Sequence, residues 1–339
     1  MKRNYLVYFK KITPLVCGFI FLFCFRTVKA QDFHLSQYDA SPLFLNPSMT
    51  GMFDGKYRIH LHYRTQWASV STKPFTTAGL AFDMPVKKLG IGIQVMNFRA
   101  GAGNYNELSA LISLSYDLAS KTNMHHLAVG VQAGMIQKSV SGDKLIFGNQ
   151  YDALNGGGFN TDISSGEVFK SANYVLPGLN AGFLYYFAKS NARLNPFFGF
   201  SAFNLTQPKQ SFLANESPLP MRFFTHGGIR INLNERIQLL PKVIYMKQLD
   251  NQEITASLLF HYFLKDANTF LILGPSFRLH DAAILEAGIK KAGYTLRVSY
   301  DFNTSPLKSV TYYKGGFEIS LTYQAGKPKI SPASNCPRL

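Results

Sequence analysis

Period-two alternation of apolar and polar residues runs through most of the 339-residue chain and limits its possible folds more than any other feature. Between Tyr57 and Tyr63, for example, aromatic and aliphatic residues alternate with arginine and histidine. Successive side chains of a strand point to opposite faces, so such a segment forms a strand with one apolar and one polar face. The pattern predicts about fourteen strands, near residues 56–66, 76–85, 89–98, 105–118, 126–138, 175–187, 196–205, 221–233, 236–247, 254–263, 269–279, 282–290, 294–302 and 316–324.

The predicted strands are long, and their length favours a membrane-spanning sheet. A tilted strand of about 9–11 residues crosses a bilayer, whereas strands of soluble proteins most often have about 5–6 residues. Charged residues make up only 16% of the chain, against about 25% in soluble domains. In hydrocarbon every backbone polar group needs a partner, so spanning strands must close on themselves. The sequence therefore predicts an all-β fold, a transmembrane antiparallel β-barrel of about 14 strands of the outer-membrane type.

The lengths of the connections between the predicted strands differ between even-numbered and odd-numbered connections, which supports the barrel independently. Even-numbered connections are all short, whereas every long connection is odd-numbered. Outer-membrane barrels have short periplasmic turns and longer external loops. We therefore expect the barrel strands to begin and end at the periplasmic side. The long connections, all expected to be external, are Trp67–Phe75, Ser139–Tyr174, Thr206–Pro220 and Asn303–Gly315.

The first thirty residues have the pattern of a secretory signal peptide. Four basic residues precede an apolar core from Leu15 to Phe25, and a small-residue cleavage site, Val28-Lys29-Ala30, follows the core. The core is too short to span a bilayer, so we predict cleavage near Ala30 and export to the outer membrane of a Gram-negative cell. Cleavage removes two of the three cysteines and leaves Cys336. The predicted organisation is a signal peptide (1–30), an N-terminal segment (31–55), the barrel (56–324) and a basic periplasmic tail (325–339).

The N-terminal segment is too apolar for a free tail. Phe33, Leu43 and Phe44 would expose large apolar surface, and Pro42 and Pro47 oppose regular structure. We expect the segment to pack against the inner wall or the periplasmic mouth of the barrel. The alternative is a flexible leader.

The sequence contains no motif that indicates catalysis or cofactor binding. Walker A and Rossmann patterns are missing, and the basic residues are not gathered into a nucleic-acid patch. His60 and His62 share a strand face with arginines on either side, which favours structural histidines over metal ligands. Glu286 and Asp301 are expected in an interior charge network with Arg297 and Lys290. We expect no enzyme, no catalytic residues, no cofactor or metal, and no nucleic-acid partner.

Several motifs, found in order along the chain, carry a resemblance to a known family. Ser-Gln-Tyr at 36–38, Leu-Asn-Pro at 45–47 and Tyr-Arg-Thr-Gln-Trp at 63–67 are similar to motifs of the PorP/SprF family of type IX secretion system membrane proteins. The resemblance implies an outer-membrane barrel of the type IX secretion or gliding apparatus, without a cofactor. The residues that carry it are Ser36, Gln37, Tyr38, Asn46, Pro47, Gly51, Arg58, Tyr63, Arg64, Gln66 and Trp67.

The resemblance also implies partners, for which the sequence offers candidate residues. The leading hypothesis is an accessory barrel that helps export or retain specific surface proteins and contacts periplasmic secretion components, within the lipid bilayer. The alternatives are a diffusion channel or transporter for small solutes and, third, a barrel enzyme. The longest external connection, Ser139–Tyr174, is interpreted as the surface that contacts cargo, and the alternative is a mobile cover without a partner. Candidate cargo residues in that loop are Tyr151, Asp152, Phe159, Asp162, Glu167 and Phe169, and candidate periplasmic-tail residues are Lys327, Lys329, Cys336 and Arg338.

Overall fold

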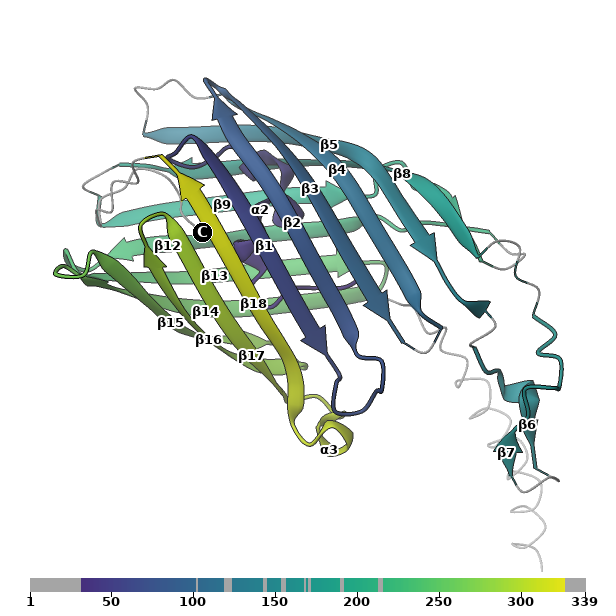
Figure 1. Ribbon diagram of the computed structural model, residues 1–339. Helices are drawn as coiled ribbons and strands as arrows, with labels where there is room; N and C mark the ends of the chain where they lie inside the picture. The colour runs from purple at the N-terminus through teal and green to yellow at the C-terminus, as the bar shows by residue number, and fades with distance from the viewer. Residues whose placement is uncertain are drawn as a thin grey trace, which may run out of the picture. The chain divides into compact units, whose positions relative to one another are not determined.

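Fourteen antiparallel strands close into one barrel in the computed structural model of the protein (Figure 1). The structure describes residues 32–101, 103–118, 124–142, 145–153, 157–167, 169, 172–189, 192–212 and 216–326. The barrel strands are β1 (Tyr57–Gln66), β2 (Phe75–Val86), β3 (Leu89–Ala100), β4 (Tyr105–Asp117), β5 (His125–Ser139), β8 (Asn173–Phe187), β9 (Leu194–Phe203), β12 (Arg222–Asn232), β13 (Ile237–Gln248), β14 (Asn251–Leu264), β15 (Thr269–Arg278), β16 (Ala282–Lys291), β17 (Tyr294–Asn303) and β18 (Lys314–Ala325).

The first and last strands complete the barrel by pairing with each other. β1 pairs with β18 from Tyr57 opposite Ala325 to Gln66 opposite Gly316. Each predicted strand has one counterpart in the barrel, and the predicted ends differ from the observed ones by three residues at most, as at the start of β14. The prediction of a 14-strand antiparallel barrel is confirmed.

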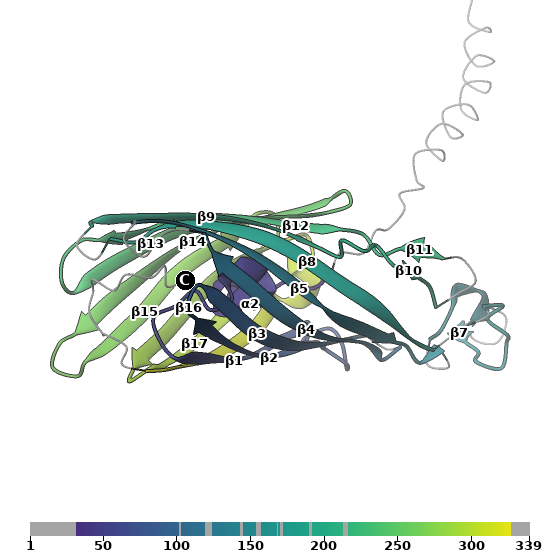
Figure 2. The same cartoon turned by 90° about the horizontal axis from the view of Figure 1, so that it is seen from above.

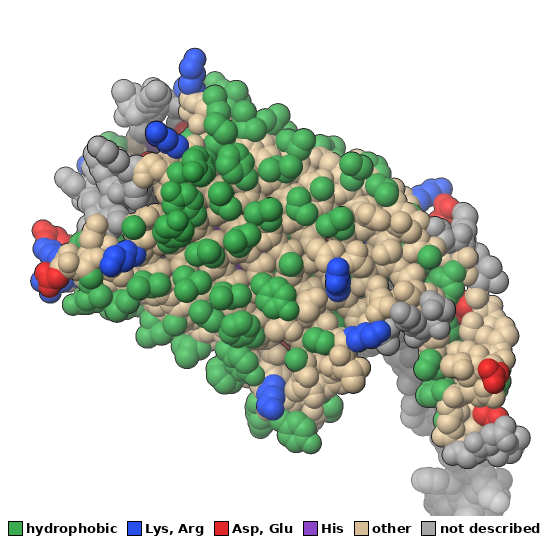
Figure 3. All heavy atoms as spheres, in the orientation of Figure 1, with side chains coloured by type: hydrophobic (Ala, Val, Ile, Leu, Met, Phe, Trp, Pro, Cys, Tyr) green, Lys and Arg blue, Asp and Glu red, His purple; other side chains and the backbone are tan. Residues whose placement is uncertain are grey.

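The two faces of the wall differ in polarity as the alternation predicts. Leu61 and Tyr63 are exposed on the outer face, whereas His60, His62 and Arg64 are buried on the inner face. Hydrophobic side chains are spread over the outside of the strands (Figure 3). Tyrosines 57, 294 and 323 cluster where β1, β17 and β18 meet at one end, with ring centroids 6.1 and 4.6 Å apart. Aromatic residues are concentrated at the interfaces of membrane barrels, and this cluster of three tyrosines lies at such a strand end.

The connections differ between the two ends of the barrel. The end where β1 begins and β18 stops carries short connections such as 87–88 and 292–293, and we call it the short-turn end. The opposite, long-loop end carries 140–172, 204–221 and 304–313. Within these loops lie small elements that the sequence pattern did not reveal: η4 (Gly148–Gln150), β6 (Tyr151–Asp152), β7 (Gly158–Phe159), β10 (Lys209–Gln210), β11 (Ser217–Pro218) and α3 (Lys308–Thr311).

The segment from Phe33 to Gly55, hereafter the lumen segment, lies inside the barrel (Figure 2). It folds into three short turns, η1 (Tyr38–Ala40), α2 (Pro42–Leu45) and η2 (Pro47–Met49). Every residue from Leu35 to Gly51 is buried. Among the described residues no helix has the length and apolarity to span a membrane. The predicted signal peptide and the tail residues Lys327, Lys329, Cys336 and Arg338 lie outside the described residues.

Arginine in place of Ile112 should destabilise the barrel, because this side chain is 60% exposed in the middle of β4. The expected loss is about 2–4 kcal/mol of unfolding free energy for Ile112→Arg, since an arginine on the lipid face costs most at the bilayer midplane. Leu89→Arg, at the short-turn end of β3, is the matched control and should cost about 0–1 kcal/mol. Denaturant titration in lipid vesicles measures both. Equal losses at the two positions would contradict the placement of the bilayer.

Candidate functional site: the lumen segment and its docking wall

The lumen segment threads from the long-loop half of the lumen to the short-turn end. Near its start, Phe33 stacks on Phe98, close to the long-loop end of β3. At its other end, Gly51 donates its backbone N–H to Asp83 near the short-turn end of β2. The segment therefore contacts the inner wall along most of the lumen, and these contacts form the candidate site.

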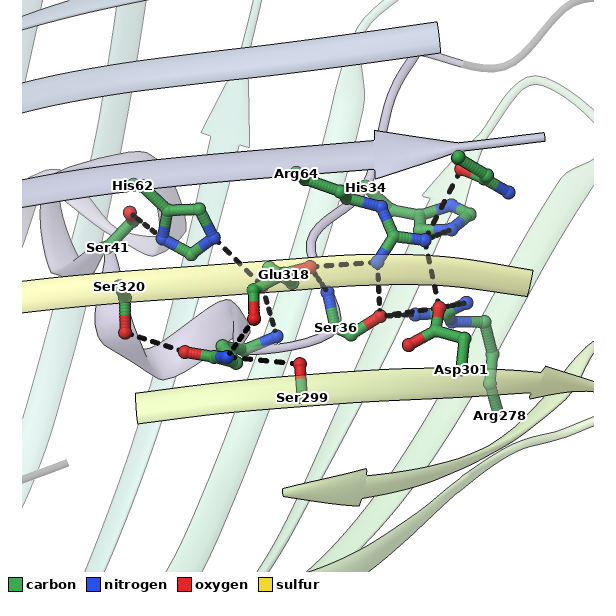
Figure 4. Close-up of polar contacts among 12 residues, drawn as sticks. His34, Ser36, Ser41, His62, Arg64, Arg278, Ser299, Asp301, Glu318 and Ser320 are labelled. Carbon is green, nitrogen blue, oxygen red and sulfur yellow. Dashed lines mark hydrogen bonds and ion pairs between the residues drawn. The ribbon is translucent and has the colours of Figure 1, made fainter. Parts of the chain in front are cut away.

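A single buried carboxylate on β18 anchors the start of the segment (Figure 4). Glu318 Oε2 accepts hydrogen bonds from the Ser36 backbone N–H and from Arg64 Nη1, each 2.8 Å long. Its Oε1 accepts the Gln37 backbone N–H at 2.6 Å and lies 2.8 Å from His62 Nε2. A fully buried carboxylate is costly unless it is paired and hydrogen-bonded, and here four groups surround it. Glu318 thus joins three parts of the chain: the segment, β1 and β18.

Side-chain hydrogen bonds extend this anchor along the segment. Gln37 Nε2 donates to Ser299 Oγ at 3.0 Å, and Gln37 Oε1 accepts from Ser320 Oγ at 2.6 Å. His62 Nδ1 lies 3.0 Å from Ser41 Oγ. A neutral imidazole protonated at Nε2 satisfies both contacts of His62, because Nε2 then donates to the carboxylate and Nδ1 accepts from the hydroxyl. These two contacts connect His62 to both the lumen segment and β18.

A second group of buried charges lies next to Glu318, on the side of the long-loop end. Asp301 Oδ2 lies 2.9 Å from Arg64 Nη2 and 3.3 Å from Arg278 Nη1. Arg278 also pairs with Glu253 at 3.3 Å, and Glu253 lies 3.1 Å from His34 Nδ1 of the segment. Because these groups are buried, their pairing is needed to offset the loss of hydration. The cluster connects the segment to strands β1, β14, β15, β17 and β18.

Deeper in the lumen, Asp39 is the second anionic anchor. Its carboxylate lies 2.5 Å from Lys242 Nζ and 2.8 Å from Arg297 Nη2, and Arg297 also pairs with Glu286 at 2.5 Å. Burial alone would raise the pKa of Asp39, but the two cations outweigh it and hold this pKa below its usual range. Burial raises the pKa of the hydroxyl of the neighbouring Tyr38. The Tyr38 ring lies 4.8 Å from Lys242 Nζ.

Asn46 fixes the middle of the segment to the opposite wall. Its Nδ2 donates to the backbone oxygens of Phe183 and Phe200, at 2.9 and 3.3 Å, and lies 3.2 Å from His226 Nε2. Its Oδ1 accepts from the backbone N–H of Ser48 at 3.0 Å and so caps η2. One fully buried amide therefore orders the turn and connects it to β8, β9 and β12, which a residue without both donor and acceptor could not do.

Two glycines of the inner wall allow the backbone of η2 to lie against the strands. A Cβ built at Gly130 of β5 would come within 2.4 Å of the Ser48 backbone nitrogen. One built at Gly90 of β3 would come within 1.9 Å of the Thr50 backbone oxygen. Both distances are shorter than real contacts, so any other residue at these positions would displace the segment.

Asp83 anchors the short-turn end of the segment. It accepts the Gly51 backbone N–H at 2.7 Å and pairs with Arg58 Nη2 at 2.8 Å. Arg58 also reaches the backbone oxygen of Met49 at 3.3 Å. Gly51 has a φ of +69°, which favours glycine, at the bend that leads the chain toward β1. The chain thus leaves the lumen next to the start of the strand that follows.

Most residues of the family-like motifs meet at this docking surface. Tyr63 and Trp67 do not: Tyr63 is 44% exposed on the outer face, and the Trp67 ring lies 4.8 Å from Phe75 at the long-loop end. The motif residues in the segment or on the wall around it are Ser36, Gln37, Tyr38, Asn46, Pro47, Gly51, Arg58, Arg64 and Gln66.

The candidate cargo residues lie apart from the lumen, in the loop 140–172. Tyr151 and Phe159 pair across the β6–β7 hairpin with ring centroids 5.4 Å apart, and both side chains are at least half exposed. Asp162 and Glu167 are exposed and Asp152 is half-buried, whereas the Phe169 ring lies against Gly142. The loop therefore exposes two aromatic side chains on a small hairpin and two acidic side chains, Asp162 and Glu167, further along the chain.

The expected charge network needs one correction. Glu286 pairs with Arg297 as predicted, but Asp301 pairs with Arg64 and Arg278, not with Arg297 or Lys290. Asp301 lies closer to the long-loop end of β17 than Arg297, so it faces a different level of the lumen.

Sequence reasoning missed several of the anchors themselves, although a signal for them exists. Asp83, Lys242 and Arg278 are charged residues on the polar face of a predicted strand, and Asp39 lies in the apolar N-terminal segment, where a buried charge requires a partner. Glu253 lies one residue before the predicted strand 254–263, within the observed β14. The described residues hold no group of three or more His, Cys, Asp or Glu side chains suited to a metal ion. The missed anchors are Asp39, Asp83, Lys242, Glu253 and Arg278.

The sequence is similar to one known protein family. A family model described as type IX secretion system membrane protein PorP/SprF matches residues 27–323. No curated protein sequence matches the chain.

Solved barrel structures give weak matches. The toluene transporter TbuX of Ralstonia pickettii is 9% identical at a TM-score of 0.48, with 85% of this chain and 94% of that chain covered. The toluene transporter TodX of Pseudomonas putida is 8% identical at 0.45, covering 86% and 93%. The KdgM porin is 7% identical at 0.39, covering 79% and 99%.

Proposed function

Since the matching family model spans most of its length, the chain belongs to the PorP/SprF family of type IX secretion system membrane proteins, and we propose that it is an accessory barrel that helps to export or retain specific surface proteins. The observation that carries the proposal is the occupied lumen. The lumen segment lies inside the barrel and is held there by the buried ion pairs of Asp39 and by hydrogen bonds of Ser36, Gln37, Asn46 and Gly51 to the wall. A barrel closed by its own chain suits a docking role better than solute diffusion.

The proposal divides the roles between the two ends of the molecule. Long external loops over a rigid barrel are where recognition is usually found. The loop 140–172 exposes Tyr151 and Phe159 on the β6–β7 hairpin and Asp162 and Glu167 after it. Aromatic residues are common anchors of protein interfaces. The long-loop end then faces outward and contacts cargo. The short-turn end faces the periplasm, where the basic tail from Lys327 contacts other secretion components. The proposal includes no catalytic step.

Shortening the loop tests the cargo role. Replacing residues 145–167 by a short Gly-Ser linker should release cargo from the cell surface into the medium, measured by immunoblotting of cells and supernatant. A second variant keeps the loop length and replaces only Tyr151, Phe159, Asp162 and Glu167 by serine, and it should show the same release. Asp266→Ser, in a turn at the short-turn end, is the control and should retain cargo.

Heat-modifiable gel mobility must first show that every variant inserts. Removing residues 327–339 should leave cargo recognition intact and abolish recovery of periplasmic components in a pull-down. If all variants insert and keep cargo and partners at wild-type levels, the accessory role is wrong and the channel hypothesis replaces it.

A further inference from the structure

The connection between β17 and β18 presents apolar side chains at the long-loop end, and we call residues 302–317 the rim loop. Hydrophobic side chains continue from the wall onto the part of the surface where Figure 1 places α3 (Figure 3). An exposed apolar patch usually marks a contact with a protein or a membrane. The exposed apolar residues of the rim loop are Phe302, Leu307, Val310, Tyr312, Tyr313 and Phe317.

Hydrogen bonds hold the rim loop in one shape, so the exposure of these side chains is a built feature. Asn303 Oδ1 accepts from the Ser305 backbone N–H at 3.0 Å, and Asn303 Nδ2 donates to Thr311 Oγ1 at 3.2 Å. The Asn303 backbone N–H donates to the Tyr313 backbone oxygen at 3.0 Å. Tyr312 and Tyr313 have φ of +52° and +61°, in the left-handed region that bulky residues rarely adopt. Backbone strain of this kind is concentrated at functional sites such as ligand clamps.

A register shift turns Lys314 to the outer face of the barrel. Tyr300 pairs with Phe317 across β17 and β18, but Phe302 pairs with Lys314, so β18 has one extra residue between the two pairs. Residues that lie opposite each other on neighbouring strands share a face. Phe302 is exposed on the outer face, next to the buried Asp301, so Lys314 also lies outside. Bulges often redirect a side chain in this way.

The rim loop is basic, and no acidic residue within it compensates the charge. Residues 302–317 include Lys308 and Lys314 but no aspartate or glutamate. Both lysine side chains are exposed, and neither has an ion-pair partner within the part of the chain that the structure describes. The backbone oxygen of Asp281 binds the start of the rim loop, but its carboxylate is paired with Arg278 at 2.9 Å. The loop 67–74, which contacts the rim loop, adds a further lysine and no acidic residue.

These features match an anionic lipid in particular. The exposed rings of Phe302 and Phe317 belong to the outer faces of β17 and β18, so the apolar patch continues the lipid-facing wall. Tyrosines are enriched where a membrane meets water. Lysines at that level attract anionic headgroups while their apolar stems stay in contact with the protein surface.

We propose that the rim loop binds a lipid that carries phosphate on its headgroup, in the leaflet at the long-loop end. Lys308 and Lys314 bind the phosphate, and Val310, Tyr312 and Tyr313 pack against the adjoining part of the acyl chains. The bound lipid contacts the last two strands at the point where β18 meets β1. This lipid site does not depend on the proposed cargo role, which rests on the loop 140–172.

Dioleoyl phosphatidate is the probe for this proposal, added to the full chain in a neutral detergent and followed by native mass spectrometry. Dioleoylglycerol keeps both acyl chains but lacks the phosphate, and it should bind at least about tenfold more weakly. Lys308→Gln and Lys314→Gln should each weaken phosphatidate binding by about fivefold, the effect of one basic residue at an anionic surface. Lys291→Gln is the matched control, because this exposed lysine lies at the short-turn end of β16. It should leave the affinity unchanged.

Two further variants test the aromatic part of the site. Tyr312→Asn and Tyr313→Asn remove a ring but retain a residue that tolerates the left-handed backbone, so the rim loop keeps its shape. Both variants should weaken the binding of phosphatidate and of dioleoylglycerol by the same factor. The lysine variants should instead weaken only phosphatidate binding.

Five results would overturn the proposal. Equal affinity for phosphatidate and dioleoylglycerol means that the acyl chains alone bind, and no binding of phosphatidate means that there is no lipid site. A loss in Lys291→Gln as large as in the two rim-loop lysine variants indicates unspecific charge attraction. Displacement of phosphatidate by 10 millimolar inorganic phosphate, roughly a free-phosphate concentration that a lipid site should withstand, assigns the lysines to the free anion. A dimer that Tyr312→Asn dissociates means that a second copy of the chain covers the rim loop.

Discussion

Removal of residues 32–54 should turn a nearly closed barrel into an open pore, with single-channel conductance in planar bilayers rising by roughly an order of magnitude or more. Eight strands already make a barrel whose interior side chains can fill, and diameter grows with strand number, so fourteen strands enclose a wider lumen. Here the lumen segment occupies that space, with every residue from Leu35 to Gly51 buried. Without it, the polar inner wall becomes the lining of a hydrated channel.

A point substitution provides a second route to the same result if the deletion prevents folding. Gly130→Leu places a side chain where the Ser48 backbone lies and should displace the segment, raising conductance in the same direction. Gly148→Leu is the matched control, because a Cβ at Gly148 meets nothing within 4 Å. Its conductance should equal that of the wild type. If the deletion of residues 32–54 and Gly130→Leu both insert into the membrane but conduct as little as the wild type, something other than the lumen segment closes the barrel.

Glu318→Ala should release the start of the lumen segment, with a loss of about 3–5 kcal/mol, the usual cost of removing one partner from a buried ion pair. The reason is that Arg64, His62 and two backbone N–H groups lose their shared acceptor while they remain buried. Hydrogen exchange at the amides of residues 35–41 should accelerate by roughly two to four orders of magnitude. Amides near η2 should change less, because Asn46 and Asp83 hold that part separately.

The control for this prediction is an ion pair without burial. Glu235 and Lys265 form a 2.6 Å pair in which both side chains are largely exposed. Glu235→Ala should leave exchange in the lumen segment unchanged, since exposed pairs contribute little. Glu318→Gln keeps one acceptor oxygen and should fall between alanine and the wild type. Retained protection at Ser36 and Gln37 in Glu318→Ala would mean that the anchor lies elsewhere.

The sequence could predict the barrel because each strand carries its own evidence. In β1 the order of Tyr57, Arg58, Ile59 and His60 is enough to assign an outer and an inner face, and this local information recurs in all fourteen strands. The two-residue strands of the β6–β7 hairpin are too short to show any period. Their pairing of Tyr151 with Phe159 could only be seen in the structure.

The docking site could be predicted only in part, because its contacts join distant parts of the chain. The motifs indicated Gln37 and Arg64, but periodicity cannot show that both meet at Glu318. The alternation shows that a charged side chain faces inward, but it does not show which neighbour the side chain pairs with. For this reason Asp301 was assigned the wrong partners. Asp39 lies outside any strand pattern, so no period marked it as an anchor for Lys242.

The pairing of β1 with β18 has a consequence for how the molecule assembles. The carboxylate that receives Ser36 and Gln37 belongs to the last barrel strand, more than 280 positions further along the chain. Contacts at such sequence separation form slowly, because a long loop must close before they stabilise anything. The start of the lumen segment therefore acquires its acceptor only when the final strand joins the first. Docking of Ser36 and Gln37 thus has to follow closure of the barrel, whereas the contacts of Asn46 with β8, β9 and β12 and of Gly51 with Asp83 of β2 do not depend on the last strand.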